Sequence, residues 1–259
     1  MSLFLRTTAL MLLMLSRAPA FASVQTTQDT EQKCSIDQNQ VCSKAFKHNL
    51  SGLYSVQTMS TTPIQPYTDF DVLYSKAHQA QAQAELEMIC KSAAMLTSTN
   101  ASFSGIKSAQ RASEKIIHEL NGQTERITDL ARATIVANDI ESLMSVYEVL
   151  NRETTLVKVK NRFKKPAASG YRDLNLLVQL PKTNLVAEVQ LHLKAIADVK
   201  NGPEHDLYES IQTIERQAAL QNRTLSEFEL AQIRSMRTES KALYQNAWQP
   251  YITTHLSAA

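Results

Sequence analysis

Apolar residues recur at helical spacing towards both ends of the chain, beginning with the segment from Val72 to Leu96. Side chains three and four residues apart share one face of a helix, so this spacing predicts amphipathic helices. Asp69 and Asp139 stand where N-caps are expected, and Asn121-Gly122 is typical of a helix end. The expected helices are 69–96, 109–120, 139–150, 194–200, 206–220 and 226–248.

Between these helices the sequence changes to short apolar runs such as ATIVA and LNLLVQL, which are typical of strands. Strands that cluster between helices favour a mixed sheet over a doubly wound parallel one. The sequence therefore predicts an α/β (α+β) fold, with a mixed sheet of about five strands flanked by helices. The expected strands are 102–107, 133–137, 154–163, 174–180 and 185–193.

Residues 1–22 have the layout of a secretory signal peptide. Arg6 precedes an apolar run, and small residues stand at Ala20 and Ala22. The run is far shorter than the roughly 20 residues of a membrane span, and no later segment is apolar enough to form one. We therefore expect cleavage after Ala22 and a secreted or periplasmic protein.

The rest of the chain divides into three parts by composition. Residues 23–67 are rich in Ser, Thr, Gln and Asn, which predicts a flexible polar leader. Residues 68–220 hold the expected strands and most of the helices, and form the predicted domain. Residues 221–259 form a helical extension that we expect to pack on that domain.

Composition excludes several classes of function. Glycine accounts for 5 of the 259 residues, and there is no glycine-rich phosphate loop or GxGxxG motif, so side chains must hold any nucleotide. The formal net charge is +2 without a basic tail, which argues against binding of duplex nucleic acid. An exported protein can form a disulfide, but the pairing among Cys34, Cys42 and Cys90 stays open.

The candidate chemistry begins with two carboxylates. Glu188 and Gln190 lie on one face of an otherwise apolar strand. A buried carboxylate is costly, so Glu188 requires a cation, a metal ion or a water-filled cleft. Asp129 precedes the strand at 133–137, from which it can face Glu188, and two such carboxylates can hold Mg²⁺. The alternative is that Glu188 pairs with a lysine and Asp129 caps a turn.

Basic and aromatic residues surround these carboxylates. The row Lys107, Arg111 and Lys115 shares one helix face, and Tyr171 offers a flat surface for a purine base. A second basic cluster can grip a polyphosphate; it comprises Lys158, Lys160, Arg162, Lys164 and Lys165. The alternatives are a solvated edge strand, a solvent-facing helix and a half-buried tyrosine.

In this order along the chain, the residues resemble the RelA/SpoT-type alarmone synthetase domain, which has a nucleotidyltransferase-like fold. The resemblance covers about residues 69–215. The matching segments are 105–116, 127–150, 161–178, 187–193 and 204–211. In the last of these, His205 and Tyr208 fall in the closing segment of the family pattern.

This resemblance implies that pyrophosphate is transferred from ATP to the 3′-hydroxyl of a guanine or other purine nucleotide, with Mg²⁺ as cofactor. It makes Glu188 and Asp129 the catalytic and metal-binding residues. It assigns nucleotide binding to Lys107, Ser108, Lys115, Arg132, Arg162, Lys164, Lys165, Tyr171, Asn175, Gln190 and His192.

The chain also departs from the family pattern. The family usually has Asp-x-x-Gly-x-Arg, whereas here Arg132 replaces the glycine and Thr134 the arginine. Asp173 and Asn175 replace a usual serine and histidine, and Gly105-Ile106 stands where an arginine is usual. Two interpretations follow: a pyrophosphotransferase, exported as an effector or toxin, or a non-catalytic nucleotide-binding module on a degenerate synthetase fold. The oligomeric state stays open.

Overall fold

The computed structural model describes residues 47–59 and 61–253. They belong to one compact unit, which spans residues 44–259. The predicted signal peptide, most of the predicted leader, and Cys34 and Cys42 lie outside the described residues. Cys90 is a buried free thiol, and burial raises its pKa to about 12.

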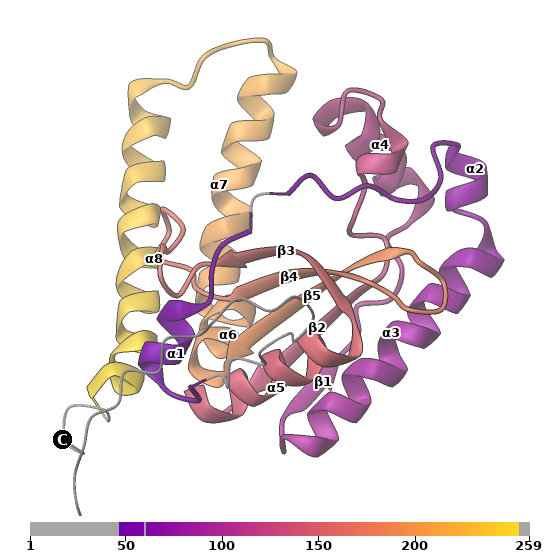
Figure 1. The fold of residues 1–259 in the computed structure, drawn as a ribbon. Coiled ribbons are helices and arrows are strands. Elements are labelled where there is room, and N and C mark those ends of the chain that lie inside the picture. The colour runs from indigo at the N-terminus through magenta and orange to yellow at the C-terminus, as the bar shows by residue number, and fades with distance from the viewer. Residues whose placement is uncertain (1–46, 60, 254–259) are drawn as a thin grey trace, which may run out of the picture. The chain divides into compact units, whose positions relative to one another are not determined.

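The centre of the unit is a five-stranded mixed sheet with the order β1-β2-β5-β4-β3 (Figure 1). The strands β2 and β5 are parallel, and the other neighbouring pairs are antiparallel. This confirms the predicted fold class. The strands are β1 (Asn100–Ser102), β2 (Arg132–Ala137), β3 (Thr155–Asn161), β4 (Leu174–Gln179) and β5 (Val186–Leu193).

One strand prediction was misplaced. The strand expected at 102–107 begins earlier, at Asn100, and ends at Ser102, where its pairing with Thr134 of β2 stops. Beyond it the backbone leaves the sheet, and Gly105 has a φ of 69°, which interrupts an extended strand.

Two helices begin at their predicted caps, Asp69 and Asp139, whereas the cap at Ser108 was not predicted. Ser108 and Asp139 accept hydrogen bonds from the first turns of their helices, because short polar side chains satisfy the free N–H groups there. The expected helix 69–96 is divided at Tyr74-Ser75 into two. The helices are α1 (Leu50–Ser55), α2 (Phe70–Leu73), α3 (Lys76–Leu96), α4 (Ala109–Glu119), α5 (Ile140–Glu153), α6 (Lys194–Asn201), α7 (Pro203–Leu220) and α8 (Glu227–Thr253), with a 3₁₀ turn at Thr124–Arg126.

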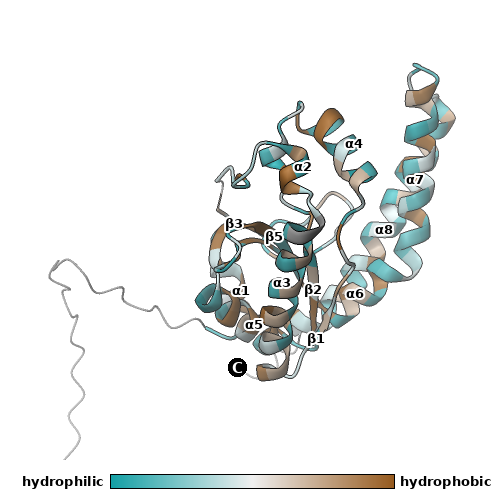
Figure 2. Cartoon of the chain, turned by 90° about the vertical axis from the view of Figure 1, so that its right-hand side faces the viewer, coloured by the Kyte–Doolittle hydropathy of each residue, from teal (hydrophilic) through white to brown (hydrophobic). Residues whose placement is uncertain are grey.

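The two faces of the sheet differ. Helices α3 and α5 contact one face, which buries aliphatic side chains such as Ile135, Leu176 and Val189. The strand register places polar side chains on the other face, in rows that cross the sheet. One row contains Arg132 and Glu188 on neighbouring strands. Helices α4 and α7 extend away from the sheet towards the top of Figures 1 and 2, on the side opposite α5.

The predicted flexible leader is wrong for its described part, residues 47–59 and 61–67. Leu53 of α1 and Val56 are buried, and Met59 pairs with Val159 of β3. The Gln65 side chain is 4% exposed and donates to the carbonyls of Ile127 and Val186. The segment has too few regularly spaced apolar residues for its packing to be predicted from the sequence. Backbone hydrogen bonds and a few buried side chains nevertheless hold it against the domain.

The C-terminal helices pack on the domain. Helix α8 contacts α6 and α7, and it buries Tyr244 and Trp248. Gly170 approaches α8 so closely that a Cβ atom would lie 3.3 Å from the Cα of Lys241, and its φ is 86°. Both observations explain the glycine before Tyr171. In the described part of the chain, no helix has the length and apolarity needed to cross a membrane.

Candidate functional site

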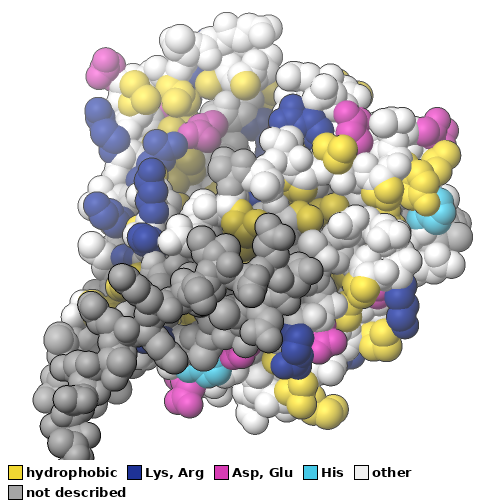
Figure 3. All heavy atoms as spheres, viewed as in Figure 1, with side chains coloured by type: hydrophobic (Ala, Val, Ile, Leu, Met, Phe, Trp, Pro, Cys, Tyr) yellow, Lys and Arg dark blue, Asp and Glu magenta, His cyan; other side chains and the backbone are white. Residues whose placement is uncertain are grey.

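A polar cleft of about 910 Å³ lies between α4 and α7. Small-molecule sites typically have about 300–1,000 Å³, so the cleft is large enough for a nucleotide. Figure 3 shows Lys and Arg side chains over α8 and beside α4. The residues that line the cleft are Lys107, Arg111, Glu114, Lys115, His118, Glu119, His205, Tyr208, Glu209, Gln212, Thr213 and Arg216. The predicted basic row therefore faces a cleft.

Two lysines of this cleft share one carboxylate. The Nζ atoms of Lys107 and Lys115 lie 2.9 and 2.8 Å from Oδ2 of Asp129, whose side chain is 14% exposed. Burial alone would raise the pKa of Asp129, but the hydrogen bonds from Lys115 and Lys107 outweigh it and lower that pKa. Asp129 is therefore ionised, and it holds both ammonium groups in place. Ser108 of the same segment caps α4 by accepting from the backbone N–H of Arg111.

Glu188 occupies the polar face of the sheet. Its Oε1 accepts from Asn175 Nδ2 at 2.5 Å and from Gln190 Nε2 at 3.3 Å. Arg132 lies opposite Glu188 in the register of β2 and β5, and its buried Nε has no hydrogen-bond partner among the described residues. Two amides thus orient the carboxylate, while the neighbouring guanidinium keeps unused donor capacity.

Lys158 and Lys160 belong to this same face, because their partners on β4 are Leu177 and Asn175. Burial lowers the pKa of Lys160, and the positive charges of Arg162 and Lys158 lower it further. Glu188 opposes this shift through its negative charge. Lys160 and the candidate catalytic carboxylate therefore interact electrostatically.

Four side chains form a network beside this centre. Arg162 Nη1 lies 2.7 Å from Oδ1 of Asp173, which is fully buried. The Tyr171 hydroxyl lies 2.9 Å from Asp173 Oδ2 and 2.6 Å from His192 Nε2. Burial, followed by the negative charge of Asp173, raises the pKa of Tyr171. Burial lowers the pKa of His192 to about 3, so its imidazole is neutral at physiological pH.

This network corrects the prediction that His192 binds a nucleotide. The residue is 1% exposed and uncharged, so it supports Tyr171 instead of contacting a phosphate. Tyr171 is half-buried, and its ring meets Tyr244 edge-on with centroids 5.7 Å apart. Arg162 lies over that ring at 5.7 Å and is paired with Asp173. The expected platform for a base is thus already in contact with protein groups.

The other residues predicted to bind nucleotide differ in how they are placed relative to Glu188. Asn175 is 6% exposed and reaches the site through Glu188. Lys164 and Lys165 are exposed in the turn after β3, and none of their described contacts leads to Glu188. The structure therefore brings together Glu188, Gln190, Asn175 and Arg132, and separately joins Asp129 with its lysines.

The predicted metal ligands were Asp129 and Glu188. Glu188 lies on β5 and Asp129 lies in the segment before β2, and no hydrogen bond links them in the described part of the chain. Within residues 47–59 and 61–253 there is also no group of three or more His, Cys, Asp and Glu side chains suited to a metal. The buried Oδ1 of Asp129 has no partner among those residues, and a carboxylate oxygen is the donor that Mg²⁺ prefers. The donor chemistry at this position fits that ion.

Sequence reasoning identified only part of the α7 wall of the cleft. It placed His205 and Tyr208 in the closing segment of the family pattern, but it assigned no role to Gln212 and Arg216, which also line the cleft. Their spacing of four residues on one helix face is a signal that could have identified them. Nothing local, however, shows that this face opposes α4.

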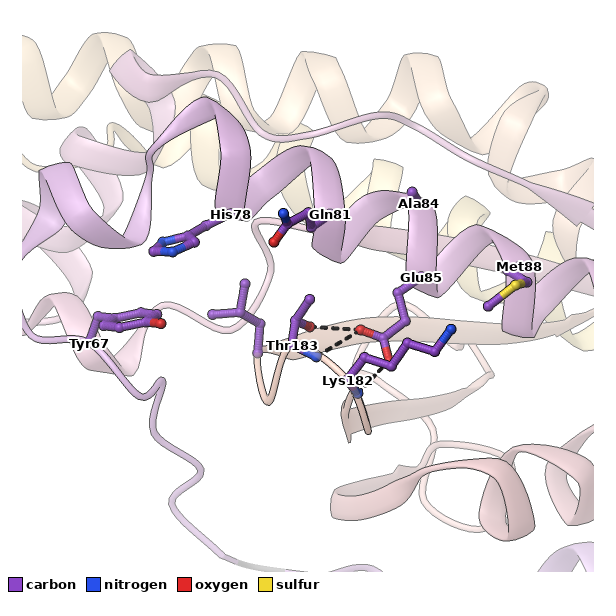
Figure 4. Close-up of a pocket in the computed structure, with 9 residues that line it drawn as sticks. Tyr67, His78, Gln81, Ala84, Glu85, Met88, Lys182 and Thr183 are labelled. Carbon is purple, nitrogen blue, oxygen red and sulfur yellow. Dashed lines mark hydrogen bonds between the residues drawn. The ribbon is translucent and has the colours of Figure 1, made fainter.

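A second cavity, of about 590 Å³, lies between α3 and the turn that joins β4 to β5 (Figure 4). The rings of Tyr67 and His78 stack at one end, with centroids 4.9 Å apart. Glu85 accepts hydrogen bonds from the backbone N–H groups of Lys182 and Thr183. Because Glu85 is satisfied by these donors, its role is to hold the turn.

Comparison with known proteins agrees with this architecture. No protein-family model matches the chain. The chain is 35% identical over 92 residues to the GTP pyrophosphokinase YwaC of Bacillus subtilis (strain 168), which covers 32% of this chain and 43% of that protein. The match thus spans less than half the length of this curated relative.

Two solved structures share the fold. The crystal structure of the complex between the Type VI effector Tas1 and its immunity protein matches with a TM-score of 0.51 and 20% identity, covering 70% of this chain and 96% of that one. Small alarmone synthetase 2 from Bacillus subtilis matches with a TM-score of 0.51 and 19% identity, covering 69% and 95%.

The chain therefore has an alarmone-synthetase-like α+β fold, with a polar sheet face and a polar cleft between α4 and α7. More specifically, the chain has the fold of a RelA/SpoT-type synthetase domain, and over part of its length it resembles a GTP pyrophosphokinase in sequence. This confirms the resemblance inferred from the sequence motifs.

Proposed function

We propose that the protein transfers a pyrophosphoryl group from ATP to the 3′-hydroxyl of a purine nucleotide. The new bond joins the acceptor 3′-oxygen to the β-phosphorus of ATP. The bond between that phosphorus and the α,β-bridging oxygen breaks, AMP leaves, and the hydroxyl proton passes to a carboxylate. The observation that carries this proposal is the row in which Arg132 lies beside Glu188, close in sequence to the lysine-bound Asp129.

Each residue has a role in this proposal. Lys107 and Lys115 turn from Asp129 to the donor phosphates, because phosphate offers them further charge-assisted hydrogen bonds. Arg132 contacts the transferred group through its guanidinium, whose buried Nε has no hydrogen-bond partner among the described residues. Glu188 accepts the proton of the acceptor hydroxyl, and Asn175 keeps the carboxylate oriented.

The acceptor phosphates are assigned to Lys158 and Lys160 on the same sheet face. Asp129, through Oδ1, and Glu188, through Oε2, are the residues that would hold Mg²⁺. When bound, Mg²⁺ neutralises phosphate charge and orients the reacting groups. Guanine nucleotides are the first acceptors to test, since the partial sequence match is to a GTP pyrophosphokinase.

The test uses the purified full chain with ATP labelled at the β- and γ-phosphates, Mg²⁺, and GTP, GDP, ATP or ADP as acceptor. We expect a product that carries both labels. Glu188→Gln should lower the rate at least about 100-fold, because a positioned general base contributes roughly that factor or more. Glu227→Gln, an exposed site at the start of α8, is the matched control.

A folded protein that binds nucleotide but transfers no label would reject this activity. That result would favour a non-catalytic nucleotide-binding module. The pairing of Arg162 with Asp173 is the observation that favours this second function, because it engages one of the predicted phosphate-binding cations.

We also propose that the protein is exported and acts as an effector on nucleotides outside its own cytoplasm. The support is the signal-peptide pattern of residues 1–22. Mass spectrometry of the expressed protein should show a mature N-terminus at Ser23. An intact Met1 on protein confined to the cytosol would contradict export without affecting the proposed reaction.

A further inference from the structure

The cleft between α4 and α7 contains one tyrosine among otherwise polar and charged lining residues. Tyr208 of α7 is 51% exposed and lines the cleft. Its hydroxyl accepts a hydrogen bond from Gln212, one turn further along the same helix, at 2.8 Å. An exposed aromatic ring in a polar cleft keeps apolar surface in contact with water, and a planar ligand would cover it.

The charges around Tyr208 favour an anionic ligand. Arg111 on α4 and Arg216 on α7 both line the cleft, and their side chains form no hydrogen bond or ion pair with any described residue. Lys107 and Lys115 add two ammonium groups on the α4 wall. Glu209 lies 3.1 Å from His205, and Glu114 and Glu119 also line the cleft, so its Lys and Arg side chains outnumber its carboxylates by four to three.

The cleft is also long enough to separate the two ends of a nucleotide. The α7 wall runs from His205 to Arg216, about 16 Å at the usual helical rise of 1.5 Å per residue. A ligand can therefore place phosphates against the lysines and a base against the α7 wall. Stacking on an aromatic ring suits any base, because every base has a π-face.

We propose that Tyr208 is the base-stacking residue of the donor site, so that the cleft distinguishes a nucleoside triphosphate from inorganic triphosphate. This rests on the proposed function, since it identifies the base end of the donor whose phosphates lie at Lys107 and Lys115. Tyr208 touches the base and takes no part in the bond changes. Stacking of one base corresponds to about a 5- to 150-fold difference in affinity.

The test measures equilibrium binding of α,β-methylene ATP and of inorganic tripolyphosphate to the full chain. We expect the unmodified protein to bind the nucleotide analogue at least about fivefold more tightly than tripolyphosphate. Tyr208→Ala should remove this preference without changing tripolyphosphate binding. Tyr208→Phe, which keeps the ring, should retain the preference.

Two matched variants complete the experiment. Phe228→Ala removes an exposed ring of α8 that does not line the cleft, and it should leave the affinity for both ligands unchanged. Lys107→Ala should weaken the binding of both ligands, because Lys107 contacts the phosphates that the two ligands share. The inference is overturned if Tyr208→Ala keeps the preference, if it weakens both ligands equally, or if the unmodified protein binds neither ligand.

This result is independent of catalysis. Selective loss in Tyr208→Ala together with no label transfer would retain the base-stacking site and reject the proposed reaction. Label transfer with an unchanged preference in Tyr208→Ala would retain the reaction and reject Tyr208.

Discussion

The two faces of the sheet differ in the burial and polarity of their side chains. On β5, Val189 and Leu191 point to the face that α3 and α5 cover, and both are at most 1% exposed. Glu188 and Gln190 alternate with them and remain partly exposed. One face is filled by packing, whereas the other holds charged groups in fixed positions. A strand thus supplies stability and candidate chemistry at once, because consecutive side chains point to opposite faces.

Replacement of Leu176 should have the largest effect on stability. The residue is fully buried on the covered face, so Leu176→Ala should lower the free energy of unfolding by about 2–5 kcal/mol. Leu177→Ala, its neighbour on the opposite face with 8% exposure, is the matched variant. We expect a smaller loss there in denaturant unfolding. Equal losses would break the contrast between the faces.

On the polar face, replacement of Asp173 should cause the next largest loss of stability. Asp173→Asn removes the charge that pairs with Arg162 and leaves the buried Tyr171 hydroxyl with a weaker partner. The expected cost is about 1.5–3 kcal/mol, the usual net contribution of a hydrogen bond to a charged group. Denaturant unfolding measures it. A variant as stable as the unmodified protein would show that this network contributes no stability.

The neutral His192 should produce a pH dependence of stability. Its folded pKa of about 3 lies below the usual histidine pKa of about 6.5, so between these values the unfolded chain binds a proton that the folded protein does not. The stability contribution is complete above about pH 6.5 and is lost as the pH falls towards 3. From pH 7 to 6 the expected loss is below about 1 kcal/mol.

His192→Gln should flatten this part of the stability curve, because it removes the group whose pKa differs between the folded and unfolded states. Unfolding midpoints of the two proteins between pH 7 and 5 provide the comparison. Parallel curves would show that His192 does not carry the effect.

The smallest change in stability should come from Glu188. Glu188→Gln keeps a side chain that accepts from Asn175 at a half-exposed position, so we expect a change within about 0.5 kcal/mol. Thermal unfolding measures this alongside the label-transfer assay. A large destabilisation would mean that the candidate catalytic carboxylate has a structural role, and would weaken the contrast between the two faces.

Local sequence patterns predicted most helices and strands and the types of residue available for chemistry. Alternation in β5 and the caps at Asp69 and Asp139 depend on neighbours in the chain, so their signals are present in short segments. The motif order also indicated the fold and singled out Glu188 and Asp129. No local pattern, however, predicts that Asp129 binds Lys107 and Lys115 or that Glu188 accepts a hydrogen bond from Asn175.

Long-range packing determined which of these residues come into contact. It tied Gln65 to Val186, made His192 a neutral support for Tyr171, and set the α7 wall opposite α4. These contacts join segments that are distant in the chain, and they follow from burial and packing of the whole domain. Local propensity therefore fixed where strands and helices form, whereas long-range packing fixed which charges are paired, which are buried and which remain free for a ligand.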